Sequence, residues 1–324
     1  MSRPVLVASV ALASYAALNF AISLVVAAVW RRLPANHARV SRAARARQLV
    51  WLRASPGVGA ALIALTVITP AFAIFEPERA SEMAGPLVIV LAVAALVQIS
   101  ASTLKAAATL ARTRAAARAW LKSAMPLDVD PPAGVPAYAI ESPAPIVALV
   151  GVFTPKLIAA RTVIESCTTD ELTAIVAHER GHLHARDNLK RWLIGCAPDA
   201  LRWTPWHREI AAAWHDAAED AADDAATRGD EGARVDLAAL LVKIARLTPE
   251  PSWPAATVSP FVEKSGLDRR VRRLLTPGER LTAPSRWVPL ATLAVAVATA
   301  AVAFNPASLE QIYFLVESVI AFGR

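Results

Sequence analysis

Cysteine is scarce in this chain, and so are the basic, aromatic-rich elements that bind nucleic acid. The two cysteines, Cys167 and Cys196, lie in a part of the sequence that its charge pattern places in the cytoplasm. We therefore expect ordinary thiols rather than a disulfide. The net charge is +7, but the arginines gather at the ends of apolar segments and no aromatic residues alternate with them. This pattern is typical of topology determinants and anionic-lipid contacts, and it argues against a nucleic-acid partner.

Charged residues are also nearly missing from four long apolar stretches. These stretches are residues 5–30, 57–75, 86–111 and 287–304. Each is about as long as the ~20 residues that a helix needs to cross the hydrocarbon layer. The chain as a whole is 55% hydrophobic, with a mean hydropathy of +0.41. We therefore predict four transmembrane helices in a lipid bilayer, and their lack of charge disfavours a transporter or channel.

The first apolar stretch is predicted to remain in the mature protein as an anchor. It is longer than the core of a signal peptide, and Arg31 and Arg32 follow it instead of a small-residue cleavage site. The second stretch contains Pro70, which a membrane helix tolerates. The sequence thus favours retention of both stretches as spans.

The distribution of arginine predicts how the spans are oriented. From Arg31 to Arg53 the sequence has seven arginines and no acidic residue, whereas residues 76–83 have three glutamates and one arginine. Loops rich in Lys and Arg stay in the cytoplasm. The N-terminus is therefore predicted outside, and the segment 112–286, between spans three and four, is predicted inside. The expected location is the cell membrane, inner or plasma.

Residues 178–182 have the form HExxH, the spacing of a zinc-hydrolase helix. Four residues along a helix advance about 400°, so His178 and His182 share one face and can bind one metal ion. Glu179 lies beside them, where it can take a proton from a water molecule. The expected cofactor is Zn²⁺.

Helix signals surround this motif. Thr168 and Glu171 have the spacing of a capping box, which marks the start of a helix. An apolar stripe leads through the motif, formed by Leu172, Ile175, Val176 and Leu183. The motif is therefore expected on an amphipathic helix, and two surface histidines on such a helix are the alternative interpretation.

A catalytic zinc site needs a third protein ligand, and Glu219 is the best candidate. It lies in an alanine-rich stretch without Pro or Gly, 211–227, that predicts a second helix. Asp223 follows four residues later on the same face, so one carboxylate can bind the metal while the other accepts a hydrogen bond from a ligating histidine. A solvated acidic helix face is the alternative.

Other residues compete for roles at this site. Competitors for the third ligand position are His207, His215, Asp220 and Asp223. His215 is the next to test because it lies four residues before Glu219 and shares its face. His184 lies about 200° round the helix from His182 and cannot bind the same ion. Candidates for stabilising the oxyanion are His215, His207 and Tyr138.

Before the motif, the sequence predicts an irregular segment and then a small sheet. Residues 126–145 contain six prolines and one glycine. Short apolar runs at 137–140, 146–150 and 157–160 are typical of strands. An exposed edge strand would let an extended peptide lie across the metal, although a sheet that only packs is equally compatible with the sequence.

Three segments carry a resemblance to a known family: 178–188, 203–206 and 219–225. Together with the four-span layout, they resemble the BlaR/MecR type of membrane-embedded gluzincin peptidase over nearly the whole chain. The resemblance implies that His178, His182 and Glu219 bind zinc and that Glu179 is the general base and acid. It also implies supporting roles around the metal for Asp187 and Asp223.

Related membrane peptidases share part of this pattern. The HtpX-like and prenyl-protein endopeptidases have the same two zinc elements, but the pair Asp223 and Asp224 and the short chain favour the BlaR/MecR type. A penicillin-binding sensor domain follows the fourth span in antibiotic-sensing members, whereas 20 residues follow Phe304 here. Beta-lactam sensing by this chain is therefore not expected.

The predicted fold is a mainly α membrane protein with an α+β gluzincin domain between spans three and four. Its divisions are 1–111 for three membrane helices, 112–286 for the cytoplasmic zinc protease domain, 287–304 for the fourth span and 305–324 for an external tail with an amphipathic helix at 309–322. The expected activity is hydrolysis of a cytoplasmic protein or peptide, with a transcriptional repressor as the suggested substrate. An HtpX-like quality-control protease and a zinc-binding scaffold without activity are the alternatives.

Overall fold

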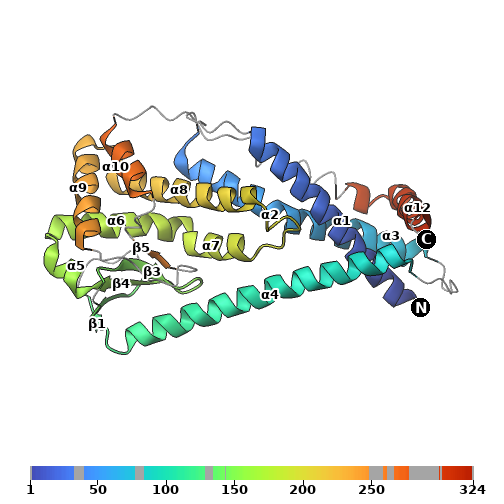
Figure 1. Ribbon diagram of the computed structural model, residues 1–324, viewed down its shortest axis with the longest axis horizontal. Coiled ribbons are helices and arrows are strands. Elements are labelled where there is room, and N and C mark those ends of the chain that lie inside the picture. The colour runs from blue at the N-terminus through green and yellow to red at the C-terminus, as the bar shows by residue number, and fades with distance from the viewer. Residues whose placement is uncertain are drawn as a thin grey trace.

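A set of long apolar helices and a smaller region of helices and sheet make up the computed structural model (Figure 1). The structure describes residues 2–32, 40–76, 84–127, 134–142, 144–247, 258–260, 266–276, 299 and 301–322.

Three helices within this described part are long and apolar enough to cross a membrane. They are α1 (Arg3–Arg32), α2 (Arg42–Ile63) with its continuation to Phe75, and α4 (Pro86–Leu121). The predicted spans 5–30, 57–75 and 86–111 fall within them. The predicted fourth span, 287–304, lies mostly outside the described residues. Helix α4 continues past its predicted span and ends beside the sheet (Figure 1).

The second of these helices changes its geometry beside Pro70. Helix α2 passes into a π-helical turn, η1 (Ala64–Ile68), and then into α3 (Thr69–Phe75). The wider turn lets Thr69 donate twice to the Ala64 carbonyl, from its N–H and from its hydroxyl at 2.8 Å. Because proline has no N–H to donate, this local change lets the helix continue through it, as expected.

The small sheet has five strands in the order β1-β2-β4-β3-β5. The strands are β1 (Met125–Pro126), β2 (Ala137–Ile140), β3 (Val147–Val150), β4 (Lys156–Ala160) and β5 (Val258–Pro260). Strands β2 and β4 are parallel, and the other pairs are antiparallel. The three predicted apolar runs are confirmed as β2, β3 and β4. Strand β3 pairs on both sides, so the open edge that the sequence allowed is not found at β3.

Six helices accompany the sheet: α5 (Arg161–Ser166), α6 (Thr169–Ala185), α7 (Asp187–Cys196), α8 (Pro205–Thr227), α9 (Glu231–Leu247) and α10 (Leu267–Leu275). One apolar core joins the sheet to α6 and α9, and its members include Leu149, Ile158, Ile175 and Leu241. All four side chains are almost completely buried. This core holds α6 beside β3, where the HExxH residues lie.

Helix α8 is longer than the predicted stretch 211–227, and it connects the two regions. It begins at Pro205, whose fixed φ suits the first helical position. Its first half packs on the membrane helices, where Ile210 and Trp214 contact a cluster that includes Val26 and Leu49. Its second half lies against α6. One straight helix therefore reaches from the membrane helices to the HExxH motif (Figure 1).

The predicted tail helix is present as α12 (Pro306–Phe322). Leu309 and Tyr313 are buried in an apolar cluster that includes residues of α1 and α3, and the Tyr313 hydroxyl donates to Glu76 at 3.2 Å. Phe314 and Leu315 point away from this contact and are exposed. Helix α12 therefore packs beside the end of α3.

Candidate metal centre

Helix α6 places both histidines of the motif on one buried face. A capping box starts the helix, in which the Thr168 hydroxyl accepts from the Glu171 N–H and the Glu171 carboxylate accepts from the Thr168 N–H. One turn separates His178 from His182, and their Nε2 atoms lie 3.1 Å apart. The exposed fractions of the two residues are 0% and 3%. The alternative of two surface histidines is therefore wrong.

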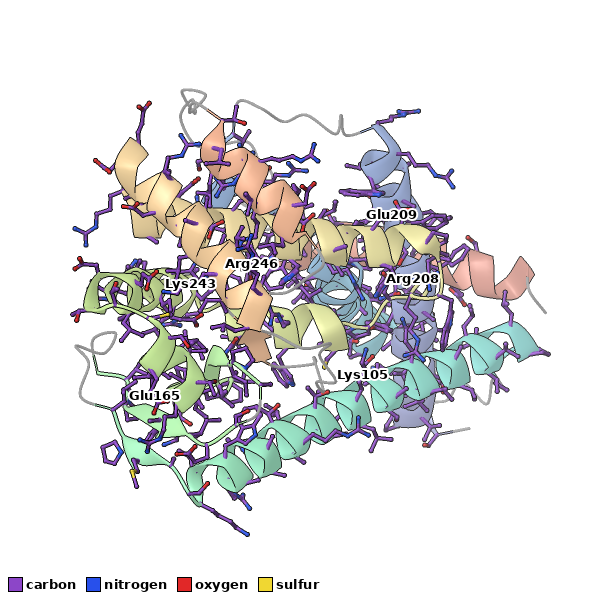
Figure 2. The ribbon with its side chains drawn as sticks, turned by 60° about the vertical axis from the view of Figure 1, so that its left-hand side comes forward. Lys105, Glu165, Arg208, Glu209, Lys243 and Arg246 are labelled. Atoms are coloured by element: carbon purple, nitrogen blue, oxygen red, sulfur yellow. The ribbon has the colours of Figure 1, made fainter. Side chains whose placement is uncertain are left out.

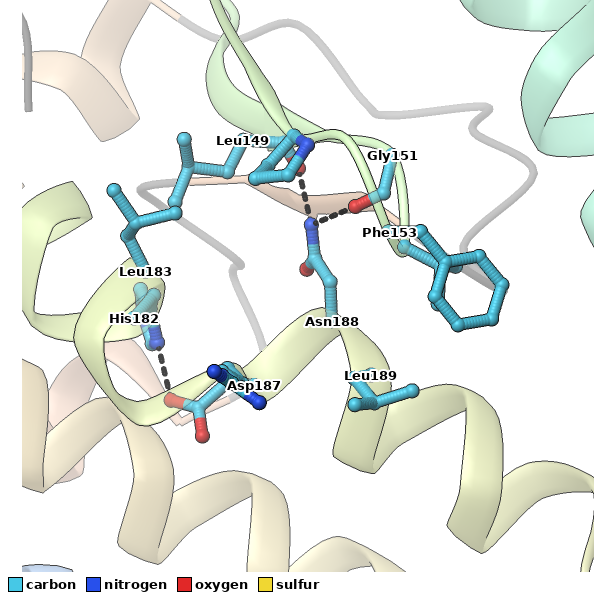
Figure 3. A pocket seen from close by; sticks show the side chains of 11 residues that line it. Leu149, Gly151, Phe153, His182, Leu183, Asp187, Asn188 and Leu189 are labelled. Atoms are coloured by element: carbon cyan, nitrogen blue, oxygen red, sulfur yellow. Dashed lines mark hydrogen bonds and ion pairs between the residues drawn. The ribbon is translucent and has the colours of Figure 1, made fainter. Parts of the chain in front are cut away.

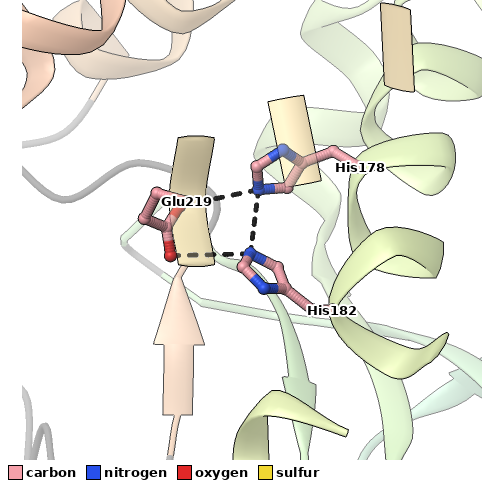
Figure 4. Close-up of side chains that lie close together, drawn as sticks. All are labelled: His178, His182 and Glu219. Carbon is pink, nitrogen blue, oxygen red and sulfur yellow. Dashed lines mark hydrogen bonds and ion pairs between the residues drawn. The ribbon is translucent and has the colours of Figure 1, made fainter. Parts of the chain in front are cut away.

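Helix α8 brings Glu219 to these two nitrogens (Figure 4). The Glu219 carboxylate lies with one oxygen 3.6 Å from His178 Nε2 and the other 3.5 Å from His182 Nε2. Together the three residues form a buried group that can hold a metal ion. The alternative of a solvated acidic face does not apply to Glu219, which is 4% exposed.

The donor atoms of this group fit a tetrahedral zinc ion. Zinc binds nitrogen and oxygen at about 2.0–2.2 Å, so two ligand atoms of a tetrahedral site lie about 3.3–3.6 Å apart. The two histidine nitrogens are 3.1 Å apart, and each has a different oxygen of Glu219 at 3.6 and 3.5 Å, so each of these pairs is close to that length. Two imidazoles and one carboxylate are also a ligand set that catalytic zinc sites use.

Each histidine of the group is oriented by a carboxylate. Asp223 Oδ1 lies 3.0 Å from His178 Nδ1, and Asp187 Oδ2 lies 2.9 Å from His182 Nδ1. Donation of the His182 Nδ1 proton to Asp187 leaves its Nε2 lone pair directed at the ligand group, while the Asp223 carboxylate lies at ion-pair distance from His178. Burial lowers the pKa of His182, but Glu219 and Asp187 outweigh it and raise the pKa to about 10. This shift shows the strong negative charge around a site suited to a cation.

The sequence interpretation missed Arg270 of α10, a cation that contacts two carboxylates of the site. Its guanidinium lies 3.0 Å from Glu219 Oε2 and 2.6 Å from Asp223 Oδ1, and the residue is 3% exposed. Burial raises the pKa of Glu219, but His182 and Arg270 together hold it well below its usual value. Arg270 therefore keeps Glu219 ionised and fixes one of its two oxygens.

A signal for this contact was present in the sequence. Arg269, Arg270 and Arg273 are spaced to share one side of a short helix. They face an acidic row on α8 formed by Asp216, Glu219, Asp220, Asp223 and Asp224. The sequence analysis counted these arginines only among those that gather at the ends of apolar segments, because charge spacing does not reveal which two helices will pack.

Glu179 lies beside the group without belonging to it. Its Oε2 accepts a hydrogen bond of 3.2 Å from the Leu149 N–H of β3, and its Oε1 has no hydrogen-bond partner among the described residues. Burial is the main cause of a raised pKa at Glu179, which the histidines oppose. A buried carboxylate with a raised pKa and one oxygen without a hydrogen-bond partner is suited to accept and return a proton.

The other residues considered at this site lie in different places. His215 is adjacent, with Nδ1 3.9 Å from Glu219 Oε1, but it is outside the group of converging ligand atoms. His207 lies far along α8 beside Arg53, and Asp220 pairs with Arg269. His184 is exposed and lies outside the group of converging ligand atoms, in line with the prediction that it cannot bind the same ion. Tyr138 of β2 is separated from β3 by β4, so it is not brought to the site.

A cavity of about 390 Å³ opens beside His182, between the β3–β4 turn and the corner of α6 and α7. Asn188 projects into it and donates to the carbonyls of Leu149 and Gly151, both at 2.9 Å (Figure 3). Its walls are mostly apolar and include Phe153 and Leu189. The cavity therefore places an apolar space next to one histidine of the candidate metal group.

Comparison with known proteins finds a family match to one part of the chain. Residues 112–205 match the model of peptidase family M48, whereas no curated protein matches the chain. The match supports a membrane-type zinc metallopeptidase family. It contains the whole HExxH motif and ends at the first residue of α8, so Glu219 is supported by the geometry and not by the match.

Proposed function

We propose that this chain is an integral-membrane zinc metalloendopeptidase that hydrolyses peptide bonds of a cytoplasmic protein. The observation that carries the proposal is the buried convergence of His178, His182 and Glu219, with Glu179 beside them. The match to peptidase family M48 supports the same chemistry. A scaffold without activity would not require a buried carboxylate at Glu179 with a raised pKa and one oxygen without a hydrogen bond.

The residues of the site have separate roles in peptide hydrolysis. Zinc held by His178, His182 and Glu219 would polarise the peptide carbonyl and acidify a water molecule. Glu179 Oε1 takes the proton of the attacking water, whose oxygen bonds to the carbonyl carbon. The same carboxylic acid then gives the proton to the leaving nitrogen as the C–N bond breaks. The Leu149 N–H holds Glu179 in place through its other oxygen.

Replacement of Glu179 tests this proposal. Because Glu179 is not a ligand, Glu179→Gln is expected to keep about the wild-type zinc content and thermal stability. Cleavage of a quenched fluorescent peptide library should fall by about 10² or more, the scale for loss of a general base. Equal cleavage by wild type and Glu179→Gln would refute the hydrolase proposal, and zinc binding without any cleavage would favour the scaffold.

The proposed substrate class comes from the BlaR/MecR resemblance, which suggests a cytoplasmic transcriptional repressor. The cavity beside His182 supports recognition of an apolar side chain near the cut bond, because Phe153, Leu189 and Leu183 line it. Co-expression of the chain with repressors encoded near its gene should yield fragments with wild type and none with Glu179→Gln. Fragments of membrane proteins instead of a repressor would favour the HtpX-like quality-control role.

We also propose that the metal site faces the cytoplasm and that the N-terminus is external. The arginines between Arg31 and Arg53 support this orientation. Reporter fusions at Arg42 and within 112–286 should read as cytoplasmic, and fusions near Glu78 or after Asn305 should read as external. An external reading within 112–286 would overturn the cytoplasmic substrate.

A further inference from the structure

The loop between α7 and α8, residues 197–204, is held by side chains of the membrane helices. Asn19 of α1 donates to the Pro198 carbonyl at 3.2 Å and accepts from the Ala200 N–H at 2.7 Å. Asn19 is 0% exposed and lies near the middle of the predicted span 5–30. Because Asn19 is fully buried, no water can replace these bonds, and the loop depends on Asn19 for its polar contacts.

The same loop carries Asp199, whose buried carboxylate contacts α1 and α2. The Asp199 carboxylate accepts from the Ser23 hydroxyl at 2.7 Å and lies 3.3 Å from the Arg53 guanidinium of α2. Arg53 is 2% exposed and also lies 2.9 Å from His207 Nε2, in the first turn of α8. His207 Nδ1 lies 3.4 Å from the Asp199 carboxylate, which closes a triangle of contacts. We call Asn19, Ser23, Arg53, Asp199 and His207 the membrane clamp.

The clamp lies at one end of the helix that carries Glu219. His207 and Glu219 are 12 residues apart on α8, which corresponds to about 18 Å of continuous helix. Between them, Ile210 and Trp214 pack on Val26 and Leu49 of the spans. Glu209, labelled in Figure 2, accepts a further bond of 2.8 Å from the Trp30 indole at the end of α1. Because α8 is continuous and packed along this length, a shift of its first turn is expected to move Glu219 as well.

The two histidines of the metal centre are connected to the clamp from the other side. Helix α6 turns at Arg186, in a left-handed conformation, directly into α7, and α7 runs into the clamped loop. Both ligand-bearing parts of the chain thus meet at 197–204. Metal–ligand distances tolerate changes of only about 0.2 Å, so the relative placement of α6 and α8 must be held closely.

We propose that the membrane clamp sets the position of Glu219 relative to His178 and His182, with Arg53 as a positioning residue of the metal centre. Rearrangement of α1 against α2 then changes the metal affinity of the site, which gives the spans control over the enzyme. The inference rests on the proposed function only in taking Glu219 as a metal ligand.

The first test measures zinc affinity of the full chain in lipid nanodiscs by competition with a chelator. Arg53→Met and Asp199→Asn are expected to weaken zinc binding about 10–100-fold, the range for groups that orient metal ligands. Arg53→Lys should restore part of the affinity, and the milder Ser23→Ala should show a smaller loss in the same direction. Arg47→Met is the matched control, because Arg47 is an exposed arginine of the same helix, and it should bind zinc as wild type does.

A double variant separates positioning from stability. Arg53→Met combined with Asp199→Asn removes both charges, so it should recover the thermal stability that either single variant loses. Zinc affinity should stay weak, because the link from α2 to the first turn of α8 is still missing. Recovery of wild-type affinity in the double variant would overturn the proposal, as would wild-type affinity in Arg53→Met.

A distance measurement reports positioning without activity. Spin labels at the exposed positions Thr173→Cys on α6 and Ala212→Cys on α8, with Cys167 and Cys196 replaced by serine, should show a broader or shifted distance distribution in Arg53→Met. The same distribution as wild type would overturn the proposal. A chain that binds zinc and responds to Arg53 but cleaves nothing would instead refute the proposed peptidase function and leave the clamp intact.

Discussion

Gly181 of α6 touches the backbone of Ala222 of α8. A Cβ placed on Gly181 would lie 3.0 Å from the Ala222 Cα, 3.3 Å from its Cβ and 3.4 Å from the Ala225 Cβ. Gly181 stands between Glu179 and His182, and Ala222 stands one turn after Glu219. The absence of side chains at this crossing is therefore what lets Glu219 come within metal-binding distance of the two histidines.

A larger side chain at Gly181, where α6 and α8 cross, should lower the zinc affinity of the site. Gly181→Val is expected to push α8 away and lower zinc affinity at least about tenfold, with a stability loss of roughly 1–3 kcal/mol from overpacking. Gly181→Ala should show a smaller effect in the same direction. Chelator competition and thermal unfolding measure the two quantities.

Gly195 supplies the control for this series. It lies within α7, and a Cβ there would meet nothing within 4 Å. Gly195→Ala should leave zinc affinity unchanged and stabilise the helix by up to about 1 kcal/mol. Wild-type zinc affinity in Gly181→Val would show that the helix spacing does not control the site.

Removal of Arg270 should damage both stability and metal binding. Arg270→Gln leaves the carboxylate of Asp223, which is 0% exposed, with fewer compensating charges. Breaking a buried ion pair in this way costs about 3–5 kcal/mol. Zinc affinity should fall about 10–100-fold, because Glu219 and the Asp223–His178 pair lose their orienting partner.

Arg272→Gln is the matched control for Arg270, because it lies on the same short helix in an exposed pair with Asp268. It should change neither unfolding temperature nor zinc affinity noticeably. Equal behaviour of Arg270→Gln and Arg272→Gln would contradict the role given to the buried guanidinium.

The cap of the HExxH helix should contribute stability that depends on pH. Lys243 and the Thr168 N–H hold the pKa of Glu171 below its usual value of 4.5. Because the folded-state pKa is depressed, the contribution is present above that usual value and is lost as pH falls through the folded-state pKa. The unfolding temperature of Glu171→Gln should be lower than wild type near neutral pH, and the two should converge in acid. A constant difference across this range would argue against the ion pair as its cause.

Local sequence patterns were sufficient to predict the parts of the site that lie on one helix. The four-residue interval between His178 and His182 determines that they share a face in any α-helix. The capping residues Thr168 and Glu171 were predicted to start that helix, and the structure confirms the capping box. The long apolar segments similarly predict membrane helices from length and composition alone.

Contacts between distant segments were harder to predict. The spacing made Glu219 the best candidate for the third ligand but left His215 open, because both residues share a face of α8; the resemblance then also pointed to Glu219. Nothing local connects Arg270 to Glu219, 51 positions earlier in the printed sequence, or Arg53 to Asp199. A long-range ion pair depends on which helices pack, and that choice is made by apolar surfaces such as the one shared by Leu49 and Trp214.

The sequence by itself determined the helix that carries His178, Glu179 and His182, because helical periodicity is a local property of the chain. It also determined the apolar spans, since a charge-free stretch of sufficient length has few alternatives in a bilayer. Only the tertiary structure decided that Glu219 completes the group, that Arg270 neutralises its surroundings and that Arg53 holds the far end of α8. These relationships depend on the packing of separate helices, where a difference of one side chain, as at Gly181, changes how closely two backbones approach.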